Sequence, residues 1–180
     1  MPKYDHLAGL MRTVTDADPD VSFATHVLPY LIDTWLEDYA RGAASDGVVE
    51  TKSSGFSYLF DVGHERLIAA WGISRGRHDG ARDKSRMAGH PLSAGQHYHR
   101  GHAIPHTLGG PTDINLVPQL GAVNVGPFRA LEREAVATPG ALYFTYWVYG
   151  RRDPRDQTPT GVEQGLLVPG TEPKIHRFTN

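Results

Sequence analysis

Residues 97–138 constrain the fold most strongly, because their pattern predicts a strand, a loop, a second strand and a helix in succession. The strands are expected at 97–100 and 115–118, and Pro127 stands in the first turn of the helix, where its missing N–H costs nothing. At helical spacing, the apolar residues of this helix share one face that would dock on a sheet. They are Phe128, Leu131 and Ala135.

The remaining strands are predicted on both sides of this unit. They cover 56–60, 66–73, 142–149, 162–168 and 175–178. Residues 142–149 have the strongest strand pattern, because aromatic and β-branched side chains favour strands. Residues 43–55 hold mainly glycine, serine and alanine, and residues 74–96 are glycine-rich and basic, so both segments are predicted to be loops.

Residues 21–40 are predicted to form an amphipathic helix, which Pro29 kinks or divides. Its apolar positions are Phe23, Val27, Leu31, Trp35 and Tyr39. Together these elements predict an α+β fold with a central, mainly antiparallel sheet. We expect one domain over residues 1–180, with a helical N-terminal extension at 1–55 and a core at 56–180.

The absence of cysteine narrows the chemistry of any site in this chain. Disulfides, thiolate metal sites and a cysteine nucleophile are excluded, so a metal would be held by oxygen or imidazole ligands. No apolar run reaches the roughly 18–20 residues that a membrane span needs, so no membrane association is expected. The N-terminus lacks a basic-then-apolar leader pattern, so we expect a cytoplasmic protein or one secreted by a route without a signal peptide.

Positive charge is concentrated in residues 75–100, although the net charge of the chain is −2. The basic residues there are Arg75, Arg77, Arg82, Lys84, Arg86 and Arg100, against only Asp79 and Asp83. The segment is either an ordinary solvated loop or a surface for a polyanion, and the charge run alone does not separate the two hypotheses.

His102, Asn124 and Glu132 form a set that suits metal-assisted cleavage of a phosphodiester. An imidazole can deprotonate water near neutral pH, and an amide oxygen can hold a hard divalent cation without adding charge. Asn124 is expected near the start of the same helix that carries Glu132, and Glu132 falls beside the packed face, so the two can border one cleft. Each residue has an ordinary alternative: a structural histidine, a helix N-cap, and a solvated glutamate paired with Arg129 or Arg133.

Five sequence elements, in this order, resemble the DNA/RNA non-specific endonuclease family, whose members are ββα-metal (His-Me finger) nucleases. The elements are Arg100-Gly101-His102, Leu108-Gly109-Gly110, Asn115-Leu116-Val117-Pro118-Gln119, Asn124-x-Gly126 and Leu131-Glu132. A looser likeness continues through residues 142–149 and Gly161-Val162. The resemblance implies that residues 97–138 form a ββα-metal motif.

By this resemblance, His102 is the general base that activates water, and Arg100 and Glu132 belong to the catalytic residues beside it. Asn124 is the direct protein ligand of one Mg²⁺, or of Mn²⁺ or another divalent ion in its place, and Glu132 orients the waters of that ion. The ion stabilises negative charge that builds on the phosphate and on the leaving oxygen. Asn115, which alone would be a turn residue, supports the site.

The chain departs from the family at His99, where an acidic residue is usual. A neutral histidine adds no negative charge, and it could ligate a softer ion such as Mn²⁺ or Zn²⁺. The family also clamps the phosphate with an upstream arginine, which the pattern does not identify here. The candidates for nucleic-acid binding are Arg75, Arg77, Arg82, Arg86 and Arg129.

The sequence therefore predicts a divalent-metal-dependent endonuclease that cleaves DNA, with RNA as a second substrate, and with little sequence specificity, since no base-reading module is visible. One hypothesis for its use is a bacterial toxin effector that an immunity or inhibitor protein neutralises. Two alternatives stay open: a catalytically inactive nucleic-acid-binding module on the same scaffold, and a sequence-specific HNH-type endonuclease.

Overall fold

The computed structural model describes residues 2–42, 47–81, 85, 87–91, 94–150, 153 and 155–180. Within these residues, a sheet of six strands has the order β1-β2-β3-β6-β7-β8, and all neighbouring strands are antiparallel. The strands are β1 (Val48–Ser53), β2 (Phe56–Asp61), β3 (Arg66–Ile73), β6 (Leu142–Tyr149), β7 (Pro159–Leu167) and β8 (Lys174–Thr179). The predicted α+β fold with an antiparallel sheet is confirmed.

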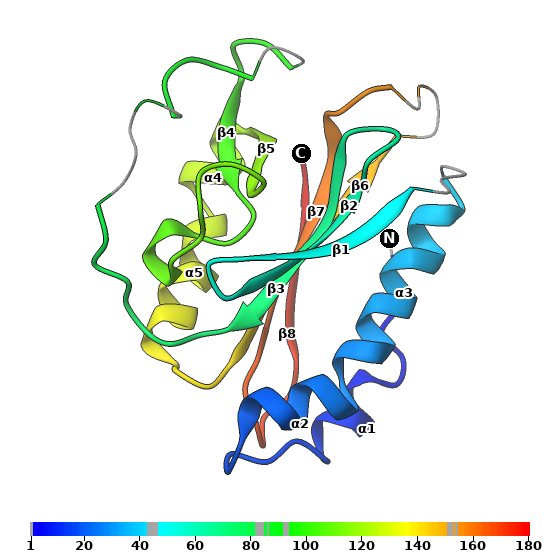
Figure 1. Ribbon diagram of the computed structural model, residues 1–180, viewed down its shortest axis with the longest axis vertical. Coiled ribbons are helices and arrows are strands. Elements are labelled where there is room, and N and C mark those ends of the chain that lie inside the picture. The colour runs from blue at the N-terminus through cyan, green and yellow to red at the C-terminus, as the bar shows by residue number, and fades with distance from the viewer. Residues whose placement is uncertain are drawn as a thin grey trace.

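The N-terminal helices cover one face of this sheet (Figure 1). They are α1 (Leu7–Met11), α2 (Pro19–His26) and α3 (Leu28–Ala40). All five predicted apolar positions of this segment are buried, and Trp35 packs on Phe144 and Tyr146 of β6. Pro29 lies in the first turn of α3, so it divides the predicted helix rather than kinking it.

A second layer lies on the opposite face, inserted in the chain between β3 and β6 (Figure 1). It contains β4 (Tyr98–His102), the 3-10 turn η1 (His106–Leu108), β5 (Leu116–Leu120), α4 (Gly121–Val125) and α5 (Phe128–Ala137). β4 and β5 pair as an antiparallel ribbon, and Phe128 of α5 packs on Trp147 of β6. Because successive strand residues point to opposite faces, β6 supplies aromatic side chains to both layers.

The prediction that Asn124 and Glu132 share one helix is wrong. Asn124 lies in α4, which ends at Val125, and Glu132 lies in α5, which begins after Gly126 and Pro127. Proline cannot donate the hydrogen bond that would continue α4, and Pro127 instead caps the start of α5. Asn124 is the fourth residue of α4, so its interpretation as a helix N-cap is also wrong.

The prediction that residues 43–55 form a loop is wrong for Val48–Ser53, which is β1 and pairs along its length with β2. Residues 43–46 lie outside the described residues. The turn between the two strands has positive φ at Ser54 (53°) and Gly55 (81°), as tight hairpin turns require. Its Ser-Gly composition therefore marks a hairpin turn and not a continuous loop.

One buried core joins side chains of the N-terminal helices, the sheet and α5. The predicted division between residues 55 and 56 falls in the turn between β1 and β2, and the domain boundaries stay a prediction. Among the described residues, no helix combines the length and the apolar character that crossing a membrane requires.

Candidate active site

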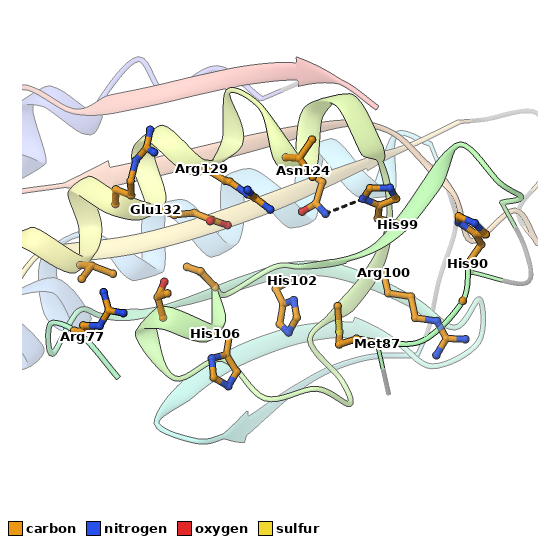
Figure 2. A pocket seen from close by; sticks show the side chains of 16 residues that line it. Arg77, Met87, His90, His99, Arg100, His102, His106, Asn124, Arg129 and Glu132 are labelled. Atoms are coloured by element: carbon orange, nitrogen blue, oxygen red, sulfur yellow. Dashed lines mark hydrogen bonds between the residues drawn. The ribbon is translucent and has the colours of Figure 1, made fainter. Parts of the chain in front are cut away.

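A pocket of about 830 Å³ opens between β4, η1 and the two helices α4 and α5 (Figure 2). It brings together four of the predicted catalytic and metal-binding residues: Arg100, His102, Asn124 and Glu132. The other residues lining it are Arg77, Met87, Gly89, His90, His99, Pro105, His106, Thr107, Val125, Arg129, Arg133 and Val136. The predicted cleft between Asn124 and Glu132 is therefore present even though the two residues lie on different helices.

His102 stands at the end of β4 and is only 6% exposed, on the pocket wall. The glycine before it is required by packing, because a Cβ at Gly101 would lie 2.3 Å from the side-chain oxygen of Gln119. Gln119 is buried on β5, so it has little room to move away. The Arg100-Gly101-His102 triplet thus sets His102 on a ribbon whose two strands are in close contact.

Asn115 immediately precedes β5 and does not line the pocket. Its Oδ1 accepts a hydrogen bond from Ile104 N (2.6 Å), and its Nδ2 donates to Ile104 O (2.7 Å) and Pro111 O (3.0 Å). Gly110 completes this contact, since a Cβ there would lie 1.9 Å from Ile104 O. The fully buried Asn115 side chain therefore fixes the turn that follows His102.

Replacing Asn115 by alanine should destabilise the protein, because the Ile104 N–H and carbonyl would lose buried partners. Each buried polar group left unsatisfied costs about 1–3 kcal/mol. Urea denaturation of the wild type and Asn115→Ala measures the difference in the free energy of unfolding. An unchanged midpoint would show that this clamp contributes nothing to the fold.

The C-terminal residue attaches the same ribbon to the main sheet. Asn180 Oδ1 accepts a hydrogen bond from Leu120 N (2.7 Å), while its Nδ2 donates to Pro118 O (3.0 Å) and Pro159 O (2.8 Å). A two-stranded ribbon is marginally stable by itself, so contacts of this kind hold β4 and its side chains in place.

The helix α5 separates its core face from its pocket face as the sequence predicts. Phe128, Leu131 and Ala135 are buried against the sheet, and each is at most 1% exposed. Arg129, Glu132 and Arg133 line the pocket. Figure 2 shows the Arg129, Glu132 and Asn124 side chains extending from the helices toward the side of the pocket where His102 lies.

Glu132 is half-buried, and a hydrogen-bonded pair of core side chains lies within range of its charge. Gln164 of β7 donates from Nε2 both to Phe128 O (2.9 Å) and to the Tyr143 hydroxyl (2.8 Å). Burial, and to a smaller extent the charge of Glu132, raises the pKa of Tyr143 well above its ordinary value. Tyr143 therefore keeps its proton and stands close enough to the carboxylate to interact with it electrostatically.

His99 and Asn124 are in direct contact across the pocket wall. Asn124 Nδ2 lies 3.4 Å from His99 Nδ1, and Figure 2 shows the amide oxygen of Asn124 turned away from His99. The contact joins β4 to α4. His99, the residue that departs from the family pattern, therefore touches Asn124, the predicted metal ligand.

The predicted nucleic-acid-binding arginines lie in different places. Arg77 and Arg129 line the pocket, and Arg77 forms an exposed ion pair with Asp79 (3.1 Å). Arg75 does not line it; its guanidinium donates to both carboxylate oxygens of Asp20 on α2 (2.7 and 2.8 Å). Arg82 and Arg86 lie outside the described residues.

The structure adds pocket residues that the sequence analysis did not place in the site: Met87, His90, His106 and Arg133. Arg133 had a usable signal, because it follows Arg129 at the i, i+4 spacing that brings two side chains to one helix face. Met87 and His90 come from the segment before β4, whose course has no such periodic signal.

The donors around the pocket suit a hard or borderline divalent ion. They are an amide, a carboxylate and imidazoles, without any thiolate. In the part of the chain that the structure describes, no three His, Cys, Asp or Glu side chains are grouped as a metal cluster. An ion here would rely on Asn124 and Glu132 and on oxygens of water or substrate, which is usual for Mg²⁺.

Residues 67–140 match the family of DNA/RNA non-specific endonucleases. The matched segment runs from β3 through α5 and includes the predicted ββα motif. The resemblance inferred from the sequence is confirmed by this match. No curated protein sequence has a significant match to the chain.

Solved nuclease structures share the fold. NucA from Streptococcus agalactiae, with no metal bound and with a magnesium ion bound, is 16% identical, and the alignment covers 82% of this chain and 88% of NucA with TM-scores of 0.52 and 0.50. The EndoG/EndoGI complex gives 13% identity, 80% and 77% coverage and a TM-score of 0.50. At these identities the likeness concerns the fold alone.

Proposed function

We propose, from the match of residues 67–140 to the DNA/RNA non-specific endonuclease family, that this endonuclease requires a divalent metal ion and cleaves DNA with little sequence specificity. The observation that carries the proposal is the convergence of His102, Asn124 and Glu132 on one pocket. Each of these residues has an ordinary role when taken alone. Their meeting in one cavity favours a shared chemical role.

His102 acts as the general base in this proposal. A neutral imidazole at the end of β4 takes a proton from the water that attacks phosphorus. The ribbon contact at Gly101 and the turn fixed by Asn115 hold the ring at the pocket wall, so little reorganisation is needed when substrate binds.

Asn124 and Glu132 would hold the metal ion on the helix side of the pocket. When bound, the ion supplies positive charge where negative charge develops on the phosphate. The Asn124 amide contributes a neutral oxygen donor, and the half-buried Glu132 carboxylate supplies the negative charge that attracts a cation. NucA, which shares the fold, has been solved with a magnesium ion bound, which supports magnesium as the ion.

The arginines around the pocket would bind the phosphates on either side of the cleaved bond. Arg77, Arg100, Arg129 and Arg133 line the cavity from three separate segments of the chain. Contacts to phosphates carry no sequence information, which agrees with low specificity.

Replacing Arg129 by alanine should weaken DNA binding about equally for different sequences and lower the slope of log affinity against log salt by about 1. Arg75→Ala is the matched comparison. We expect it to change the affinity and the salt slope less than Arg129→Ala does, because Arg75 is paired with Asp20 away from the pocket. Fluorescence anisotropy without metal, at several salt concentrations, measures both slopes. An equal loss in the two variants would contradict this placement of the phosphate contacts.

The test of the proposed function is cleavage of supercoiled plasmid and of single-stranded RNA in Mg²⁺, in Mn²⁺ and in EDTA. We expect nicked and linear plasmid with metal, a broad distribution of fragments on long DNA, and no cleavage in EDTA. Binding without cleavage in any divalent metal would favour the inactive module. Discrete fragments would favour a sequence-specific HNH-type enzyme.

An inhibitor protein is the partner we propose for such an enzyme in a cell. A nuclease of the same fold, EndoG, has been solved in a complex with EndoGI that concerns its inhibition. A bacterial toxin effector with its immunity protein would be one setting. Expression of the active enzyme in a bacterial host should then be harmful unless the neighbouring gene is also expressed, and harmless expression without it would count against this role.

A further inference from the structure

His99 is held so that one ring nitrogen faces the helix side of the pocket. On the Nε2 side the ring lies against the start of α4, where a Cβ added to Gly121 would be 2.8 Å from that atom. On the other side, Nδ1 lies 3.4 Å from the amide nitrogen of Asn124 (Figure 2). The ring is half-buried and lines the pocket, so its Nδ1 is directed at the residue proposed to hold the metal ion.

The separation of these two groups matches that of neighbouring ligands on one ion. Two donors that each lie about 2.1 Å from a metal are about 3.0–3.4 Å apart at octahedral or tetrahedral angles. The two ends of an asparagine amide have nearly the same shape, so a half-turn would place Oδ1 where Nδ2 now lies. Asn124 and His99 would then present an oxygen and a nitrogen to the same point.

We propose that His99 is a further protein ligand of the ion, beside Asn124, and that it shifts the preference of the pocket from Mg²⁺ toward Mn²⁺ and other borderline ions. The inference rests on the proposed function, in which Asn124 holds the metal. Imidazole nitrogen is a good ligand for Mn²⁺, Co²⁺, Ni²⁺ and Zn²⁺, whereas Mg²⁺ prefers oxygen. Within the described residues no group of three His, Cys, Asp or Glu side chains is present that would outweigh the effect of one imidazole on the metal preference.

The neighbouring histidines are less well placed for this role. His90 Nδ1 lies 2.9 Å from Tyr98 O, and its ring centroid is 6.5 Å from that of His99. His106 packs edge-on against His78, with ring centroids 5.9 Å apart. His99, by contrast, is in direct contact with Asn124.

The test measures metal binding directly, without DNA. Free Mn²⁺ is followed by electron paramagnetic resonance during titration of the protein, and Mg²⁺ is then added as a competitor. The variants are His99→Ala, His99→Asp and Asn124→Ala. His26→Ala is the control, because His26 is exposed on α2 on the opposite face of the sheet. His99→Gln, which keeps a polar side chain without imidazole, replaces His99→Ala should the latter fail to fold.

We expect the wild type to bind Mn²⁺ more tightly than Mg²⁺. His99→Ala should weaken Mn²⁺ binding about 10-fold or more while changing Mg²⁺ binding much less, and His99→Asp should restore Mg²⁺ binding relative to Mn²⁺. Pulsed resonance of bound Mn²⁺ should show coupling to an imidazole ¹⁴N in the wild type and in His26→Ala. That coupling should be lost in His99→Ala.

Three outcomes separate the inference from the function beneath it. An unchanged Mn²⁺ to Mg²⁺ preference and an unchanged ¹⁴N coupling in His99→Ala would overturn the inference, and the proposed metal site would stand if Asn124→Ala abolished binding. Equal losses of both ions in His99→Ala, with no ¹⁴N coupling in the wild type, would mean that His99 only orients the Asn124 amide, and would also overturn it. Binding that survives Asn124→Ala would remove the metal site of the proposed function itself.

Discussion

Replacing His102 by alanine is expected to lower the single-turnover rate of DNA cleavage by about 10²–10⁴-fold at saturating metal, the range that a positioned general base contributes. The proposed base lies at the end of β4 and is only 6% exposed. No other described histidine occupies that strand end. DNA affinity and metal affinity should change little, because the phosphate and metal contacts are assigned to other residues. The loss should therefore be in the rate and not in binding.

The measurement uses a fluorescently labelled duplex with enzyme in excess. Since His102 is buried, His102→Gln is made in parallel to retain most of the side-chain volume, and melting curves are recorded for both variants. His26→Ala is the control and should cleave at the wild-type rate. A rate within a few-fold of wild type in a folded His102 variant would exclude His102 as the base.

Replacing Asn124 by alanine is expected to raise the metal concentration for half-maximal cleavage by about 10–100-fold, the range observed when groups that support a metal are removed. Asn124 projects from α4 into the pocket opposite His102, and no other amide side chain lines that cavity among the described residues. Removing its oxygen leaves Glu132 as the oxygen donor on the helix side. The maximal rate should fall as well, because the remaining contacts position the ion less well.

Asn124→Asp is the informative partner of that variant, because it keeps an oxygen ligand and adds charge. It should retain metal binding at concentrations near those of the wild type, whereas Asn124→Ala should not. Val125→Ala, one residue along α4, controls for general effects on the short helix. Metal titrations of the cleavage rate give all four values, and an unchanged half-maximal concentration in Asn124→Ala would contradict its role as a ligand.

Periodic patterns made much of the fold predictable from the sequence. The apolar face of α5 at Phe128, Leu131 and Ala135 is buried as expected, and β6 has the predicted bounds of Leu142–Tyr149. These elements were predictable because their side chains repeat with the period of the structure they form. β1 was missed because it is short and half-exposed and follows a segment rich in glycine and serine. That composition is typical of a loop, so it gave no sign of the strand or of its pairing with β2.

Contacts between distant residues could not be predicted in the same way. The contact of His99 with Asn124 and the attachment of Asn180 to β5 depend on how separate elements meet in space, which no local period records. The same is true of Arg75 and Arg77, which are close in sequence but lie in different surroundings. Arg75 forms an ion pair with Asp20, whereas Arg77 lines the pocket. The grouping of His102, Asn124 and Glu132 in one pocket was therefore predictable from ordered motifs, whereas the partner of each residue was not.

The most direct single measurement is plasmid cleavage by the wild type and by the double variant His102→Ala/Asn124→Ala, in Mg²⁺ or Mn²⁺ and in EDTA. Both proteins are first shown to have the same fold by circular dichroism and melting. We predict that the wild type nicks the plasmid only when metal is present and that the double variant leaves it supercoiled under every condition. Nicking by the folded double variant at the wild-type rate would contradict the assignment of this pocket as the active site.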